Sequence, residues 1–182
     1  MTNVTASERS LPSEVGSAHP RTLIVGLGNP ILGDDGVGWR IAELLRADLQ
    51  TQIQAGEVEV DCLALGGLSL MERLVGYQHA IIIDAITTHQ DQPGAVSWFP
   101  LEALPDNAAG HTTATHDTSL RTALAVGRSM GAILPDRVQI IAVETEQVYN
   151  FSEELSPPVA AAITPAEKIV LDLLNISQGG PP

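Results

Sequence analysis

Basic residues are scarce in this chain of 182 residues. Nine lysines and arginines stand against 22 aspartates and glutamates, which gives a formal net charge of −13. A nucleic-acid partner requires clustered positive charge for its phosphates, and no segment of the sequence contains such a cluster. The sequence therefore argues against nucleic-acid binding. It is compatible with a protein that recruits cations or basic peptide segments, or with one whose charge serves solubility alone.

Aromatic residues and cysteine are also rare. The chain has two residues each of Trp, Tyr and Phe, so stacking platforms for nucleic-acid bases are not expected. Cys62 is the single cysteine, which excludes an internal disulfide. Because it lies in a run typical of a strand, we expect a buried and inert thiol.

Long apolar runs are missing as well. No run approaches the roughly 20 residues that cross a bilayer, and Met1–Pro20 lack the apolar core of a signal peptide. We expect a cytoplasmic monomer with no membrane partner. Its organisation is predicted to be a flexible tail over residues 1–20, one catalytic α/β domain over 21–177 and a short tail over 178–182.

The most informative stretch present is a glycine-rich turn after an apolar run. It reads Leu23-Ile-Val-Gly-Leu-Gly-Asn-Pro-Ile-Leu-Gly-Asp-Asp-Gly-Val-Gly38. Asn29 is expected to close the turn through its own side chain, with Pro30 stiffening it. Asp34 and Asp35 stand at the entry of a predicted helix, where one or both would cap it in the simplest interpretation.

Apolar runs alternate with amphipathic stretches along the rest of the chain. The predicted strands are Thr22–Leu27, Glu57–Ala64, Ala80–Ile86, Ala95–Phe99 and Arg137–Val143. The predicted helices are Val37–Leu49, Ser69–Val75, one that starts at Asp117 or Thr118 and ends near Gly131, and two within Pro157–Asn175. The connection Thr87–Gly94 is too short for a helical crossover, so the fourth strand should run antiparallel to the third. The pattern predicts a three-layer α/β/α sandwich with a mixed, mostly parallel five-stranded sheet of phosphorylase/hydrolase-like type.

Three carboxylates fall at one edge of the predicted sheet. Ligands of such sheets bind beyond the carboxyl ends of the strands, where the strand order reverses. If the first strand is central, the loops after the first and third strands face each other there, which brings together Asp34, Asp35 and Asp84. Asp84 interrupts a run of isoleucines, where a carboxylate is costly unless it is exposed, paired or metal-bound. The simpler alternative for Asp84 is a helix cap or a hydrogen bond to a neighbouring turn.

An imidazole would complete a metal-binding set. His116 lies in a long polar loop directly before a predicted helix, and His111 and His89 are the competing choices. Two carboxylates and one imidazole suit a divalent ion such as zinc, nickel or iron. A single histidine in a loop is more often only solvated.

Other catalytic motifs are absent or incomplete. Gly26-Leu-Gly28 begins like a dinucleotide-binding loop, but Ile31 stands where the third glycine belongs. The sequence has no Walker lysine, no Gly-x-Ser-x-Gly elbow and no His-Glu-x-x-His helix. The sequence therefore contains no motif of the ordinary serine, cysteine or zinc-helix proteases. It also identifies no cofactor-binding residues.

The motifs together resemble the hydrogenase maturation protease family. The resemblance is carried by Gly26–Gly38, by Ile-Ile-Ile-Asp84-Ala-Ile, by His116-Asp-Thr-Ser-Leu and by the later segment Phe151–Ile163. It covers roughly residues 21–175. It implies an aspartyl-type endopeptidase that removes a C-terminal extension from the precursor of a nickel–iron hydrogenase large subunit, after nickel has been inserted.

The resemblance also implies the roles of individual residues. The family's metal-contacting positions map onto Asp35, Asp84 and His116, which would serve as both metal ligands and catalytic residues. Asp35 stands where some relatives carry glutamate, whose carboxylate reaches about one methylene further. The nickel would belong to the substrate, so the ion would be supplied by the precursor. Asp34 would orient a water molecule.

Two rival functions remain open from the sequence. The sequence also resembles the opening of peptidyl-tRNA hydrolases over Leu23-Ile-Val-Gly-Leu-Gly-Asn-Pro30. That family continues with a Tyr and then an Arg-His-Asn stretch, and neither follows here. A nickel-binding chaperone on the same scaffold would use the same three ligands. The charge of −13 weighs against a tRNA substrate.

Overall fold

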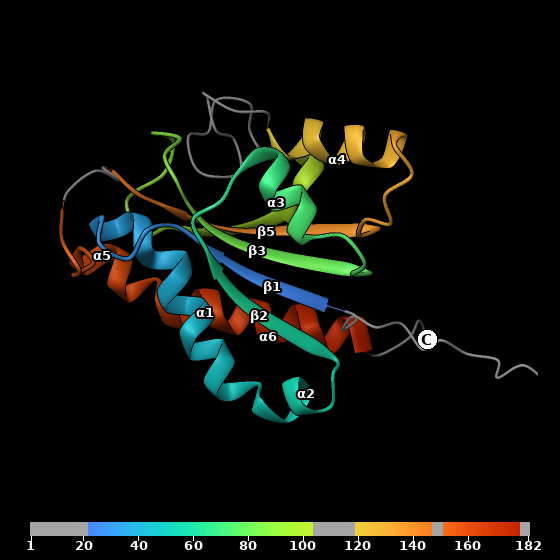
Figure 1. Cartoon of the computed structure of the whole chain (residues 1–182). Helices are drawn as coiled ribbons and strands as arrows, with labels where there is room; N and C mark the ends of the chain where they lie inside the picture. The colour runs from blue at the N-terminus through green and yellow to red at the C-terminus, as the bar shows by residue number, and fades with distance from the viewer. Residues whose placement is uncertain (1–21, 104–118, 147–150, 179–182) are drawn as a thin grey trace, which may run out of the picture.

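The protein forms a sheet covered by helices on both faces (Figure 1). The computed structural model describes residues 22–103, 119–146 and 151–178. Five strands make up the sheet: β1 (Thr22–Leu27), β2 (Val58–Leu63), β3 (His79–Ile86), β4 (Val96–Pro100) and β5 (Arg137–Glu144). Their order is β2-β1-β3-β5-β4. All neighbours are parallel except β4, which pairs antiparallel with β5.

Helices of two layers pack against this sheet. Their bounds are η1 (Gly33–Gly36), α1 (Val37–Asp48), α2 (Gln50–Gln54), α3 (Gly67–Arg73), η2 (Leu101–Ala103), α4 (Leu120–Ser129), α5 (Pro157–Ala161) and α6 (Ile163–Gln178). Apolar side chains of α1 and α6 form one core with one face of the sheet, and those of α3 and α4 form a second core on the other face. Figure 1 shows α3 and α4 above the sheet and α1 and α6 below it.

The predicted architecture is confirmed. Every strand begins and ends within one residue of its predicted bounds, and β1 lies between β2 and β3 as expected. The fourth strand does run antiparallel to the third, but β5 lies between them. The C-terminal region consists of two helices, as predicted. In the described residues, no helix is long and apolar enough to cross a bilayer.

Some local predictions are wrong. Helix α4 begins at Leu120 because Ser119 caps it by accepting a hydrogen bond from the Thr122 N–H, whereas a start at Asp117 or Thr118 was predicted. The short helix α2 was not predicted. Cys62 is only partly buried. That burial still raises the pKa of the Cys62 thiol, and a protonated thiol fits the expected inert residue.

Helix α1 rests directly on backbone at the ends of two strands. A Cβ atom at Gly38 would overlap the carbonyl oxygens of Leu27 and Ile83, which belong to β1 and β3. A Cβ at Gly26 would likewise overlap the carbonyl oxygen of Gly38. Only glycine permits this approach, which fixes the first turn of α1 over the point where the strand order reverses.

We predict that Gly38→Ala lowers the free energy of unfolding by about 1–3 kcal/mol, because the added methyl group must displace strand backbone. The sign is diagnostic, since Gly→Ala at an unhindered helical position stabilises by about 0.5–1 kcal/mol. Urea unfolding followed by circular dichroism measures the difference. An unchanged or increased midpoint would contradict the close packing of α1 on the strands.

Candidate functional site

The loop after β1 folds back on itself through short hydrogen bonds. The Ile31 N–H donates to Asn29 Oδ1 (3.2 Å), which confirms that the Asn29 side chain closes the turn. Gly28 has a φ of 128°, and a Cβ there would overlap the carbonyl oxygen of Asp35. The loop is therefore tight enough that its second half, η1, lies against its first.

Asp35 is held inside this loop. It is 7% exposed, and its Oδ2 accepts a hydrogen bond from the Asn29 N–H at 2.6 Å. The prediction that Asp34 or Asp35 caps the first helix is wrong, because the N-cap residue of α1 is Gly36. The carboxylate stabilises the turn instead of the helix.

Asp34 fastens the loop to a distant part of the chain. Its Oδ1 accepts a hydrogen bond at 2.6 Å from the Ser156 N–H, 122 positions away in sequence. Next to it, the Gly33 N–H donates to the carbonyl oxygen of Ser152 (2.7 Å), and the Ser152 N–H donates to that of Ile31 (3.1 Å). The segment before α5 is thus attached to the loop after β1 like a short added strand.

Asp84 lies within β3 and is fully buried. It therefore does not lie at an exposed strand tip. Along β3 its side chain shares a face with Ile82 and Ile86, which pack in the core formed by α3 and α4. Because η1 contacts β3, Asp35 and Asp84 come from neighbouring elements at the predicted edge of the sheet.

His116 and His111 lie outside the described residues. The segment that carries them leads to Ser119 and α4, the helix that packs on the face of the sheet shared by Asp84. His89 is described and follows β3 with a φ of 58°, which is unusual for a residue other than glycine. In the parts of the chain that the structure describes, no group of three or more histidine, cysteine or acidic side chains is arranged to hold a metal ion.

Glu144 is a buried acid that the sequence interpretation missed. It ends β5, is 4% exposed, and accepts hydrogen bonds from the Thr88 N–H (2.7 Å), the Thr88 hydroxyl (2.8 Å) and the His89 N–H (2.9 Å). The carboxylate therefore fixes the turn after β3, including the strained backbone of His89. Its position at the end of an apolar run, Ile140-Ile-Ala-Val-Glu, is the signal that singled out Asp84 and could have found it too.

A family model described as hydrogenase maturation protease matches residues 39–173 of the chain. The matched residues begin just after Asp35, and they include Asp84 and Glu144. The matched residues therefore include strands β2 to β5 and helices of both layers, but not the loop after β1.

Individual proteins agree with this match. Hydrogenase 2 maturation protease of Escherichia coli K12 is 30% identical over 157 residues, which are 86% of this chain and 92% of the relative. The hydrogenase expression/formation protein HoxM of Azotobacter vinelandii is 26% identical over 159 residues, 85% of this chain and 72% of the relative. The solved structure of the hydrogenase maturating endopeptidase HybD from E. coli has a TM-score of 0.67 at 28% identity, over 86% of this chain and 93% of that chain. The predicted fold class agrees with that structure.

We predict that Glu144→Ala lowers the free energy of unfolding by about 2–4 kcal/mol, because it leaves three donors of the turn after β3 without their acceptor. The amides of Thr88 and His89 should exchange with deuterium much faster than in the unaltered protein. Glu146→Ala is the matched control, since Glu146 is exposed and lies two residues further along. Equal effects of the two substitutions would show that the Glu144 carboxylate does not hold this turn.

Proposed function

Because the chain belongs to the hydrogenase maturation protease family, it is a peptidase, and we propose that it removes the C-terminal extension of a nickel–iron hydrogenase large-subunit precursor after nickel insertion. The nickel is part of the substrate and arrives with the precursor. We propose further that the enzyme acts as a monomer in the cytoplasm. The family membership argues against the peptidyl-tRNA hydrolase alternative that the first loop alone had left open.

The observation that carries this proposal is that two buried acids come from contacting elements at one edge of the sheet. Asp35 and Asp84 are distant in sequence, yet they lie on elements in contact at the switch point of the strand order. Neighbouring carboxylates in an apolar setting repel each other, and a shared divalent cation offsets that repulsion. The arrangement supports a role for both as ligands of an incoming metal ion.

In this proposal, His116 supplies the third ligand. Carboxylate oxygen and imidazole nitrogen are both ligands of divalent nickel. The shared ion would fix the precursor so that its scissile peptide is held beside the sheet edge, and it could polarise the peptide carbonyl as a Lewis acid. A water molecule is then the nucleophile, in keeping with the lack of a serine or cysteine elbow.

The structure supports a positioning role for Asp34. Its Oδ1 already accepts the Ser156 N–H, so the carboxylate ties the first loop to the segment before α5. The expectation that Asp34 orients a water molecule remains a prediction. A fixed loop keeps Asp35 in one place while the precursor docks.

We predict that Asp84→Asn lowers the rate of precursor cleavage by at least about a hundredfold, because a neutral amide is a poor ligand and misplaces the ion and the peptide bond. Mass spectrometry of nickel-loaded precursor, before and after incubation, measures the shortened product. Asp136→Ala is the matched control, because Asp136 is exposed at the other end of the sheet. Cleavage by Asp84→Asn at the rate of the control would remove Asp84 from the site.

The same assay with nickel-free precursor tests the role of the ion. We expect no product, since the ligands would have nothing to bind. If the empty precursor is cut as fast as the loaded one, substrate-bound nickel plays no part in recognition. A nickel chaperone on this scaffold would leave both precursors at full length and would retain nickel after dialysis.

A further inference from the structure

An open groove of about 580 Å³ runs beside the first helix. It lies between α1 and the segment that leads through α5 into α6. Its apolar lining comes from both sides and consists of Leu44, Leu155, Ala160 and Ile163. Leu44 lies on α1 and is 45% exposed, so apolar surface of α1 remains open to solvent there.

The rim of the groove is mostly acidic. Glu43, Glu153 and Glu154 line it together with a single base, Arg40. Arg40 already pairs with Glu43 at 3.5 Å, and its Nη2 donates to the carbonyl oxygen of Glu153 (3.3 Å). The two acids that follow, Glu153 and Glu154, are exposed and have no other base beside them in the groove lining. The groove therefore suits an occupant that is apolar on one side and basic on the other.

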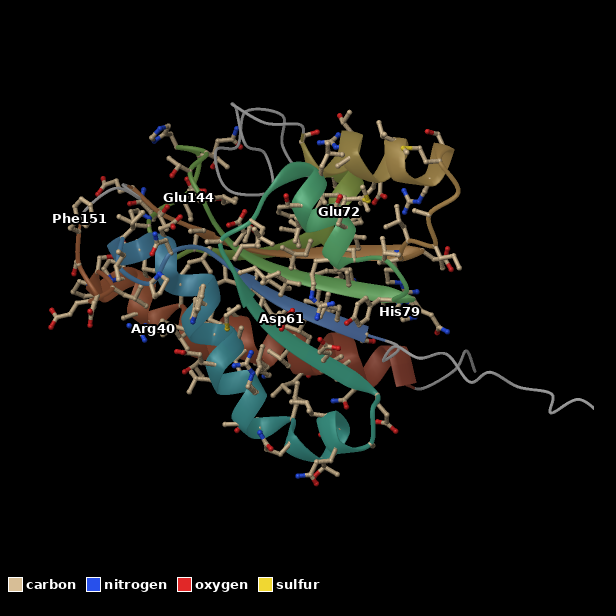
Figure 2. All side chains as sticks on the ribbon, viewed as in Figure 1. Arg40, Asp61, Glu72, His79, Glu144 and Phe151 are labelled. Carbon is tan, nitrogen blue, oxygen red and sulfur yellow. The ribbon has the colours of Figure 1, made fainter. Side chains whose placement is uncertain are left out.

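One wall of the groove belongs to the segment that is hydrogen-bonded to the loop of the candidate site. Leu155 in its lining precedes Ser156, whose N–H bonds to Asp34. In the same segment, Phe151 is 87% exposed and adjoins Ser152, which pairs with the loop after β1. Figure 2 shows Phe151 and Arg40 on the same side of the molecule, whereas Glu72 lies on α3, across the sheet.

We propose that this groove docks a basic, apolar-faced segment of the precursor polypeptide and leads it toward the sheet edge at Asp35. The inference rests on the proposed function and adds where the polypeptide itself is held. An acidic segment is disfavoured by the rim and by the charge of −13 on the whole chain. Phe151, two residues before Glu153 of the groove lining, provides an exposed aromatic side chain in the same segment.

The test is steady-state cleavage of nickel-loaded precursor by the double variant Glu153→Lys/Glu154→Lys. We expect KM to rise about three- to tenfold with kcat unchanged, because two exposed rim charges are reversed while the chemistry is untouched. The salt dependence of KM should also weaken or change sign. Glu72→Lys, which reverses an exposed charge on the opposite face, should behave as the unaltered protein.

A second variant, Leu44→Gln, separates the apolar contribution from the charge. It should raise KM without altering the salt dependence, since no charge changes. If both groove variants match Glu72→Lys in KM and salt response while the unaltered enzyme cuts the precursor, the groove assignment is wrong and the proposed function stands. A lower KM for the lysine variant would overturn the assignment of a basic segment.

Two other results would also overturn the inference. If the unaltered enzyme leaves loaded precursor at full length, the proposed function fails and the docking role fails with it. If sedimentation shows a dimer for the unaltered enzyme and a monomer for the lysine variant, a second copy of the chain occupies the groove.

Discussion

The close approach of α1 to the sheet is the constraint on which the candidate site depends. Gly26 and Gly38 remove the side chains that would hold helix and strand apart, so the helix start lies on the carbonyl groups of Leu27 and Ile83. This contact places η1 at the ends of β1 and β3 rather than out in solvent. Asp35 is buried for that reason, although it belongs to a loop. With side chains at these two positions, β1 and α1 could not approach closely enough to bring this acid to the strand that carries Asp84.

The segment that leads into α5 also holds the loops at this edge of the sheet in place. Ser152 and Ser156 bond to the loop after β1, and a Cβ at Gly94, in the turn after β3, would overlap the carbonyl oxygen of Pro158. One stretch of chain therefore contacts both the loop that carries Asp35 and the turn that follows β3, the strand of Asp84. Glu144 fixes the second loop from within the sheet. Sites that must hold an ion are precise when their supporting loops are held by hydrogen bonds of this kind.

Much of this could be predicted from the sequence, and the reason differs from one feature to the next. The strands could be found because β1, β3 and β5 are buried on both faces and read as continuous apolar runs. The turn at Asn29 could be found because its chemistry is local. The hydrogen bond from Ser156 to Asp34 could not be predicted, because Ser156 lies 122 positions away and no local pattern indicates it. The expected cap of α1 was wrong because Asp34 bonds to the distant Ser156, whereas Asp35 bonds to Asn29 in its own loop.

The two proposals assign two contributions to precursor recognition: a weak one from the groove and a selective one from the substrate-bound ion. Contacts in the proposed groove would be the same for loaded and empty precursor, so they would raise the affinity for both equally and could not distinguish them. Exposed ion pairs contribute only about 0.2–1 kcal/mol each, which keeps that common term small. In the proposed function the metal ligands act in the opposite way, because only a precursor that carries its cation would be bound by them. A protease that must leave nickel-free precursor uncut benefits when the groove contributes less binding free energy than the metal ligands do. A groove that bound more tightly would hold nickel-free precursor at the site and exclude the loaded one.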